Sequence, residues 1–228
     1  MSTIADNTLQ VSSRIQAAAK AAHRDENSIQ LLAVSKTKPA EALREAYAAG
    51  IRDFGENYLQ EALGKQLELA DLPLIWHFIG PIQSNKTRAI AEHFDWVHSV
   101  DRLKIAQRLS EQRPADLPPL NICIQVNVSG EASKSGCTPA DLPALADAIS
   151  ALPRLKLRGL MAIPEPTEDR AAQDAAFAAV QNLQASLNLP LDTLSMGMSH
   201  DLESAIAQGA TWVRIGTALF GARDYSRP

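Results

Sequence analysis

Cysteine and aromatic residues are both scarce in this chain of 228 residues, and each shortage excludes a class of protein. The two cysteines, Cys123 and Cys137, form no C-x-x-C pair and stand at no metal-ligand spacing. They cannot make a disulfide framework, so we expect two reduced thiols in a cytoplasmic protein. Aromatic residues make up 5% of the chain, which argues against a surface on which nucleic-acid bases stack.

Long apolar stretches and runs of like charge are missing as well. No segment approaches the roughly 18 apolar residues that a membrane-spanning helix needs, and residues 1–28 lack the apolar centre of a signal peptide. The net charge is −4, with acidic and basic residues interspersed. Neither a basic arm for nucleic acid nor a basic membrane-binding tail is therefore expected.

Short apolar segments, bounded by turn residues, alternate with alanine-rich segments of helical period. Each apolar segment is typical of a buried strand. The expected strands are Leu31–Ser35, Asp53–Gly55, Ile75–Ile79, Trp96–Ser99, Asn121–Val128, Lys156–Ile163, Thr193–Ser195 and Trp212–Ile215. The expected helices between and after them are Pro39–Ala49, Asn57–Leu69, Lys86–Glu92, Arg102–Glu111, Pro139–Ala151, Glu168–Leu187, Ser199–Gln208 and a short one near Ala218.

This alternation predicts a parallel sheet covered by helices. Eight strand–helix units favour a closed (β/α)8 barrel, or TIM barrel, in which residues 1–228 form a single domain. One extra helix is expected within the first two dozen residues. The alternative is an open doubly wound sheet, but the first strand–helix turn, VSKTKP, contains no glycine and is no dinucleotide-binding fingerprint.

A lysine stands directly after the first expected strand, in the stretch QLLAVSKTKP. In a barrel of this kind the active site lies at the C-terminal ends of the strands, so the amine of Lys36 would enter the barrel mouth. Desolvation disfavours a charged lysine, and a neutral amine can form a Schiff base with an aldehyde. The alternative is a lysine that extends to solvent or pairs with Glu56, and position alone favours neither.

Two loops rich in Ser, Thr and Gly follow the seventh and eighth strands, where barrels frequently bind phosphate. Ser199 stands at an expected helix start, so its alternative role is that of an N-cap. Gly216 and Thr217 precede the short last helix, whose first N–H groups favour an anion. A lysine that traps aldehydes, opposite a phosphate site, suggests pyridoxal 5′-phosphate (PLP) or a phosphorylated sugar aldehyde as the ligand.

Arg214 lies within the apolar strand WVRIGT and needs a partner there. It could form a structural ion pair with a carboxylate across the barrel. It could also donate to the pyridine nitrogen of PLP. Because arginine stays protonated, the ring nitrogen would then stay unprotonated, and the ring would be a weaker electron sink.

The histidines carry no metal-binding signal. His77, His93 and His98 lie near the ends of strands and helices, and no H-x-x-x-H pair occurs. No carboxylate completes a zinc-ligand spacing with them. We therefore expect structural histidines and no metal.

Seven ordered motifs resemble those of the pyridoxal phosphate homeostasis proteins, the PROSC/YggS-like family. The resemblance covers about Leu31 to Tyr225. The motifs are LLAVSKTKP, FGENYLQEALGK, WHFIGPIQSNKTR, HSVDRLKIAQRL, QVNVSGEASKSG, LRGLMAIPEP and LSMGMSHDLESAIAQGATWVRIGTALFGARDY.

The resemblance implies a barrel similar to the N-terminal domain of bacterial alanine racemase, with PLP bound to Lys36 as a Schiff base. Ser199 and the Gly216–Thr217 loop would hold the phosphate, Arg214 would face the ring nitrogen, and Asn57 would lie beside the ring. The cofactor-binding residues it implies are Lys36, Asn57, Ser199, Arg214, Gly216 and Thr217.

Two further lysines have less defined roles. Lys134, in SKSG, matches a second family lysine near the barrel mouth. Lys38 is assigned only to the positive charge of the rim.

The family resemblance implies a carrier or regulator of PLP, with effects on amino-acid and keto-acid balance and with no catalytic residue. Apo forms of PLP enzymes would be its partners. The alternative is a PLP-dependent amino-acid racemase of low activity, which needs a second base opposite Lys36. Only Tyr58 is a plausible candidate, since we expect no second domain, and for the same reason we expect a monomer. A cofactor-free aldolase that uses Lys36 is a third hypothesis, which Arg214 and the motif order disfavour.

Overall fold

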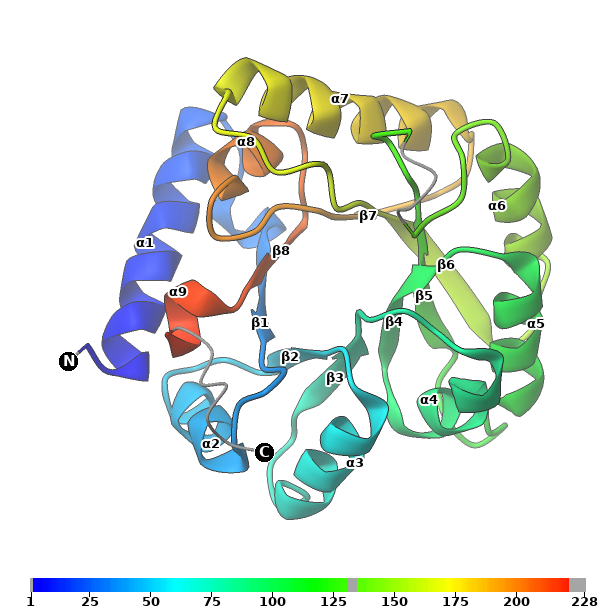
Figure 1. The fold of residues 1–228 in the computed structure, drawn as a ribbon, viewed down its shortest axis with the longest axis horizontal. Coiled ribbons are helices and arrows are strands. Elements are labelled where there is room, and N and C mark those ends of the chain that lie inside the picture. The colour runs from blue at the N-terminus through cyan, green and yellow to red at the C-terminus, as the bar shows by residue number, and fades with distance from the viewer. Residues whose placement is uncertain (1, 131–134, 222–228) are drawn as a thin grey trace.

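The computed structural model describes residues 2–130 and 135–221. Eight parallel strands close into a barrel in chain order, because β8 pairs with β1 (Figure 1). This confirms the predicted (β/α)8 architecture. The strands are β1 (Gln30–Val34), β2 (Asp53–Glu56), β3 (Ile75–Phe78), β4 (Trp96–Val100), β5 (Leu120–Gln125), β6 (Leu155–Met161), β7 (Thr193–Ser195) and β8 (Trp212–Ile215).

Helices surround the barrel, and an extra helix at the N-terminus is present as expected. The α-helices are α1 (Ile4–Ala21), α2 (Ala40–Ala48), α3 (Leu59–Glu68), α4 (Thr87–His93), α5 (Leu103–Gln112), α6 (Leu142–Ser150), α7 (Arg170–Ser186), α8 (Leu202–Ala207) and α9 (Thr217–Phe220). Two short 3-10 helices are η1 (Glu26–Ser28) and η2 (Ser84–Lys86). Helix α1 packs against α2, α8 and α9, so it covers the part of the barrel where β8 meets β1. No helix among the described residues has both the length and the apolar character needed to cross a membrane.

Local sequence signals account for several helix ends. Thr3 and Asp6 form a capping box at the start of α1. Pro39 is the residue just before α2, where its missing N–H costs nothing. Gly50 and Gly209 follow the ends of α2 and α8 with φ angles of 103° and 97°, a conformation that favours glycine.

The predicted strands Leu31–Ser35 and Ile75–Ile79 end one residue later than the observed ones, and two others extend further. The expected strand Asn121–Val128 ends at Gln125, because the chain then turns and Val126 bridges to Cys137. The expected strand Lys156–Ile163 ends at Met161. In both places the sequence stays partly apolar beyond the strand, so the apolar pattern alone could not locate the end.

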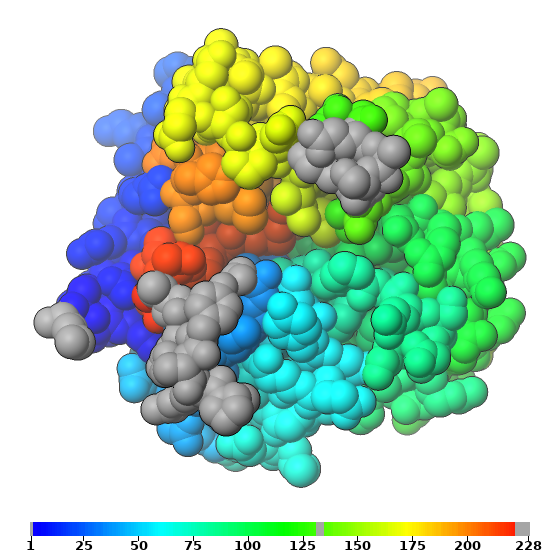
Figure 2. Space-filling view, in the orientation of Figure 1, coloured from blue at the N-terminus to red at the C-terminus, as the bar shows by residue number. Residues whose placement is uncertain are grey.

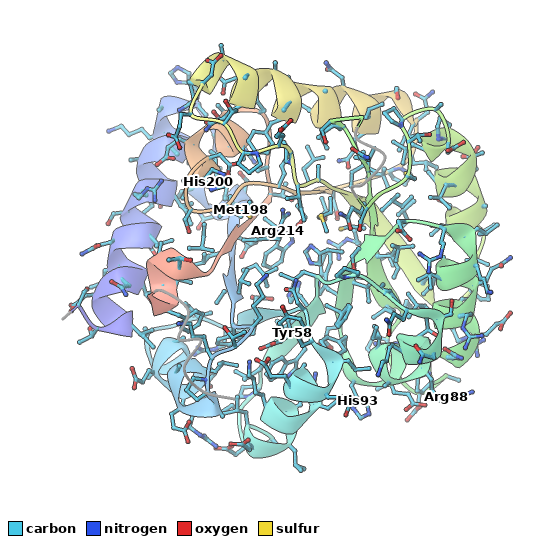
Figure 3. The ribbon with its side chains drawn as sticks, in the orientation of Figure 1. Tyr58, Arg88, His93, Met198, His200 and Arg214 are labelled. Atoms are coloured by element: carbon cyan, nitrogen blue, oxygen red, sulfur yellow. The ribbon has the colours of Figure 1, made fainter. Side chains whose placement is uncertain are left out.

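The barrel interior holds two histidines in place of the usual branched apolar residues. His77 and His98 are fully buried, and their Nδ1 and Nε2 atoms lie 2.9 Å apart. The Trp96 ring stacks on His77 with ring centres 5.5 Å apart, and the Trp212 ring meets His77 edge-on at 4.9 Å. Both histidines are therefore hydrogen-bonded parts of the core, as expected, whereas His93 is exposed at the end of α4 (Figure 3).

Burial keeps the two histidines neutral. It lowers the pKa of His77 to about 3, and it lowers the pKa of His98 well below its usual value, with the nearby His77 and Arg214 acting in the same direction. An unfolded chain would bind protons at these rings below pH ~6.5, while the folded chain would not. Each ring therefore contributes stability that is complete above pH ~6.5 and is lost as the pH falls toward the folded pKa.

We expect the His98→Gln variant to be less stable than the wild type at pH 7.5, by about 1–3 kcal/mol, because a buried hydrogen-bonded group is replaced. The difference should narrow as the pH falls from 6.5 to 4.5, by at most ~1.4 kcal/mol per pH unit, because only the wild type must keep His98 neutral. Urea unfolding at a series of pH values measures this. The exposed His93→Gln variant is the control, and a His98→Gln difference that does not change with pH would contradict the analysis.

Candidate functional site

A cavity of about 240 Å³ opens at the C-terminal end of the barrel strands. Segments from both ends of the chain meet on this face, where the orange and red C-terminal segments lie beside the blue N-terminal ones (Figure 2). The sequence-predicted site residues come together here. All six of them line the cavity: Lys36, Asn57, Ser199, Arg214, Gly216 and Thr217.

The segment that carries Lys36 is held on both sides. The Ser35 hydroxyl donates to Glu56 Oε1 at 2.6 Å, and the Thr37 N–H donates to Glu61 Oε1 at 2.6 Å. Thr37 has a φ of 65°, which is a strained conformation for a β-branched residue. Such a conformation persists only where the surroundings impose it, so the chain around Lys36 is fixed by its neighbours.

A buried ion pair lies beneath this segment. Lys65, in α3, donates to Glu56 Oε1 and to the Ser35 carbonyl, both at 2.8 Å, and also to Glu61. Glu56 is fully buried and Lys65 is 5% exposed. Burial raises the pKa of Glu56, while Lys65 and Ser35 act to lower it. Lys65 is thus the counter-ion of Glu56, the carboxylate that one form of the alternative had assigned to Lys36.

Arg214 reaches the cavity from β8 and is almost fully buried. It donates from Nη1 to the Ser195 hydroxyl and from Nη2 to the Ala162 carbonyl, both at 2.9 Å. Burial lowers its pKa to about 10, so the guanidinium remains charged at pH 7. The ion pairs of the described residues do not include Arg214, so the expected structural ion pair with a carboxylate is not found there.

The loop that carries Ser199 differs from the expected helix start. Helix α8 begins at Leu202, and Asp201 is the residue before it, so the N-cap interpretation of Ser199 is wrong. Asp201 Oδ1 accepts the Met198 N–H at 2.6 Å, which closes a turn and delays the helix. The Ser199 carbonyl accepts from Arg14 of α1 at 3.0 Å. Ser199 therefore lines the cavity instead of capping the helix.

The second loop passes close to β1. Gly216 precedes α9, which begins at Thr217. A Cβ atom at Gly216 would lie 3.3 Å from the Val34 carbonyl oxygen, so this position favours glycine. The first N–H groups of a helix have no partners within it, and those of α9 begin at the cavity lining. The loop can therefore present N–H groups and the Thr217 hydroxyl to an anion.

Asn57 provides a sign of a missing ligand. Its Oδ1 atom is buried, and it has no hydrogen-bond partner among the described residues. A buried acceptor without a partner costs about 1–3 kcal/mol, so such atoms call for an explanation. The cavity thus holds an amine, a buried cation, hydroxyl and N–H donors, and an unsatisfied acceptor. This set of groups fits an aromatic aldehyde that carries a phosphate. The residues present thus fit PLP.

Lys38 has a more specific place than sequence reasoning assigned to it. Its Nζ atom donates to the carbonyls of Phe220 and Gly221, at 3.1 and 3.2 Å. Lys38 therefore ties the segment after β1 to the end of α9 across the cavity mouth. Met198 and His200, which are not among the six predicted residues, also line the cavity (Figure 3). They lie in the same loop as Ser199, which was the available signal.

The tyrosines do not enter the cavity lining of the described residues. Tyr58 is 52% exposed at the start of α3, apart from Met198, His200 and Arg214 (Figure 3). Tyr47 packs beneath the guanidinium of Arg52. Lys134 and Tyr225 lie outside the described residues. No cluster of three or more His, Cys, Asp or Glu side chains that could hold a metal occurs within residues 2–130 and 135–221.

The sequence and the fold are similar to those of known proteins. Residues 8–224 match the family model of the alanine racemase N-terminal domain. A pyridoxal phosphate homeostasis protein from Pseudomonas aeruginosa is 78% identical, over 100% of this chain and 99% of the relative. The structure of PipY from Synechococcus elongatus PCC7942 with PLP bound is 44% identical with a TM-score of 0.85, and covers 96% of this chain and 100% of PipY.

Alanine racemase from Corynebacterium glutamicum shares the fold. It is 18% identical with a TM-score of 0.68, and the alignment covers 99% of this chain and 62% of the racemase. At this identity the likeness concerns the barrel alone.

We expect the Lys65→Met variant to lose about 3–5 kcal/mol of stability at pH 7.5, because it leaves the Glu56 carboxylate buried without its counter-charge. The loss should shrink at pH 5, where the carboxyl can bind a proton. Urea unfolding at both pH values measures this. The exposed Lys156→Met variant is the matched control, and equal costs for the two variants would show that the ion pair does not stabilise the Lys36 segment.

Proposed function

The chain belongs to the alanine racemase N-terminal domain family, and we propose that it is a PLP-binding protein of PLP homeostasis that holds the cofactor beside Lys36. The observation that carries this proposal is the meeting of Lys36, the buried Arg214 and the Gly216–Thr217 loop in one cavity. The 78% identical relative named for PLP homeostasis and the PLP-bound structure of PipY support it.

Each residue of the cavity has a proposed role. PLP supplies an aldehyde and an electron-withdrawing ring. The amine of Lys36 holds the aldehyde carbon in a Schiff base. Ser199, Gly216 and Thr217 bind the phosphate through hydroxyl and N–H groups, as anions bind at helix starts.

Two side chains orient the ring. Arg214 donates to the ring nitrogen, because Ser195 and Ala162 occupy only two of its five N–H groups. Asn57 lies beside the ring, where its amide can hydrogen-bond the ring hydroxyl.

The cavity supports binding and delivery better than turnover. Racemisation requires a second base on the face of the substrate opposite Lys36, and Tyr58, the candidate that the sequence offered for that role, does not line the cavity. We therefore assign no catalytic residue, and we propose that the protein buffers PLP and delivers it to apo forms of PLP enzymes. Through those enzymes it would affect the balance of amino acids and keto acids.

The remaining properties follow from the same hypothesis. We propose that residues 1–228 form one cofactor-binding unit that works as a monomer in the cytoplasm. The state of the cysteines supports that compartment, since Cys123 and Cys137 are both free and buried. Burial raises the pKa of Cys123 to about 12 and that of Cys137 to about 11, so neither thiol is reactive at pH 7.

The purified protein incubated with PLP should be yellow, and the Lys36→Ala variant should lose the covalent chromophore, because no amine remains to bind the aldehyde. Borohydride reduction followed by mass spectrometry identifies the modified residue. Lys156→Ala, which removes an exposed lysine, is the matched control and should label as the wild type does. A colourless wild-type protein, or a label on another lysine, would refute the assignment.

A transfer assay separates the carrier from the racemase. PLP-loaded wild-type protein, passed through a desalting column, should restore activity to an apo PLP enzyme. An aldehyde scavenger that removes free PLP should leave the transfer largely intact if delivery is direct. The same loaded protein, incubated with single L-amino acids, should form no D-isomer, and turnover at ordinary enzyme rates would overturn the carrier assignment.

A further inference from the structure

Arg214 is the first member of a hydrogen-bonded chain that crosses the barrel interior. Its Nη1 atom lies 2.9 Å from Ser195 Oγ, which lies 2.7 Å from His98 Nδ1. His98 Nε2 lies 2.9 Å from His77 Nδ1, and His77 Nε2 lies 2.9 Å from Asp53 Oδ1. The chain thus links five strands, β8, β7, β4, β3 and β2.

The chain connects the cavity to the opposite end of the barrel. Arg214 is its only member in the cavity lining. Ser195, His98 and His77 are fully buried. Asp53 is the first residue of β2, at the N-terminal end of the strands, and its side chain is 19% exposed.

The direction of every hydrogen bond in the chain is determined by its ends. A guanidinium can only donate, and an ionised carboxylate can only accept. Burial raises the pKa of Asp53 to about 6, so it is ionised at pH 7.5. Because both histidines are neutral, each has one N–H, and His77 must use its own toward Asp53. His98 then donates from Nε2 to His77, and the Ser195 hydroxyl donates to His98 Nδ1.

The surroundings leave these groups few other partners. The rings of Trp96 and Trp212 pack on His77 and His98 and separate them from solvent. Hydrogen bonds in such an environment are strong and polarise one another. Apolar residues would fill the space equally well, so packing alone does not account for three polar side chains lined up on Arg214.

We propose that Ser195, His98 and His77 are positioning residues for Arg214, which orient its guanidinium at the cavity and transmit the charge of Asp53 to it. The inference rests on the proposed function, since the chain would act on the electrostatic field at a bound PLP ring. The carboxylate strengthens each acceptor along the chain and so reduces the positive field of Arg214 at the ring nitrogen. Without that charge, the ring and the linkage to Lys36 lie in a more positive field.

The first test uses the protein without cofactor. Histidine ¹⁵N NMR at pH 7.5 should show His77 and His98 both neutral, with the proton on Nε2 in each ring, and assignment uses the His77→Gln and His98→Gln variants. A proton on Nδ1 of either ring would overturn the direction of the chain. This result does not depend on PLP binding.

The second test follows the visible spectrum of the PLP-loaded protein against pH. The Asp53→Asn variant should move the pH midpoint of the spectral transition of the Lys36-linked chromophore downward by about half a unit, because loss of a negative charge disfavours the protonated form. Asp95→Asn is the matched control, since Asp95 is a carboxylate just before β4 that lies outside the chain and whose pKa burial raises, as it does that of Asp53. A purely long-range charge effect would move both midpoints alike and would overturn the proposal.

A double-mutant cycle tests transmission through the chain. Ser195→Ala interrupts it next to Arg214, so Asp53→Asn should have little further effect on the midpoint in the Ser195→Ala background. An undiminished effect of Asp53→Asn in the Ser195→Ala background would overturn the proposal. If Ser195→Ala does not fold, the comparison of Asp53→Asn with Asp95→Asn still tests the proposal. If the wild type forms no chromophore, the proposed function fails, whereas a chromophore with one midpoint in all variants refutes only the positioning role.

Discussion

Closure of the barrel between β8 and β1 is the constraint on which the site depends. These two strands are the first and last in the sequence, and their parallel pairing sets Leu32 opposite Arg214 and Ala33 opposite Ile215. The same register carries both strands to the cavity at their C-terminal ends, so that Lys36 and the Gly216–Thr217 loop lie on one wall of it. Helix α1 packs over this junction from outside, and Arg14 holds the Ser199 loop from there. The amine and the loop that we propose to bind the aldehyde and the phosphate are thus brought together by strand pairing rather than by proximity in the chain.

The two buried positive charges of the site, on Lys65 and on Arg214, have different partners. Lys65 is compensated locally, because Glu56 lies 2.8 Å away in the same buried cluster. Among the described residues, Arg214 donates to the neutral Ser195 and Ala162 oxygens, and the carboxylate of Asp53 stands three side chains further along. A local ion pair fixes the chain around Lys36 but would neutralise Arg214 as a donor. The charge of Asp201 acts to raise the pKa of Arg214, and the ion pairs of the described residues do not join the two, so the guanidinium can still donate toward the cavity.

The sequence was sufficient for the barrel and for five of the cavity-lining residues, Lys36, Ser199, Arg214, Gly216 and Thr217, because these depend on local patterns, whereas Asn57 came from the family resemblance. Apolar strands that end in polar residues indicate the C-terminal face, and motifs such as VSKTKP and VRIGT lie at those ends. The start of α8 was misplaced because Asp201 binds the Met198 N–H, a turn that no apolar pattern records. The hydrogen-bonded chain from Arg214 to Asp53 could not be predicted either, since it depends on which side chains of five strands meet inside the closed barrel. Of its members, only Arg214 carried a signal, as a charge within an apolar strand.

The proposed carrier role requires a cofactor that is held firmly and still released, and the groups proposed for its ring and its phosphate are anchored in different parts of the molecule. The groups that orient the ring are anchored in the barrel itself, through the buried chain behind Arg214 and the ion pair beneath Lys36. The groups proposed for the phosphate lie in loops that depend on segments outside the barrel, since Arg14 of α1 holds the Ser199 carbonyl and Lys38 holds the end of α9. Displacement of α1 or α9 would loosen the phosphate loops without disturbing the ring site. Under the proposed function, the barrel interior would orient the ring, and contacts from outside the barrel, such as that of Arg14 of α1, would hold the phosphate loops.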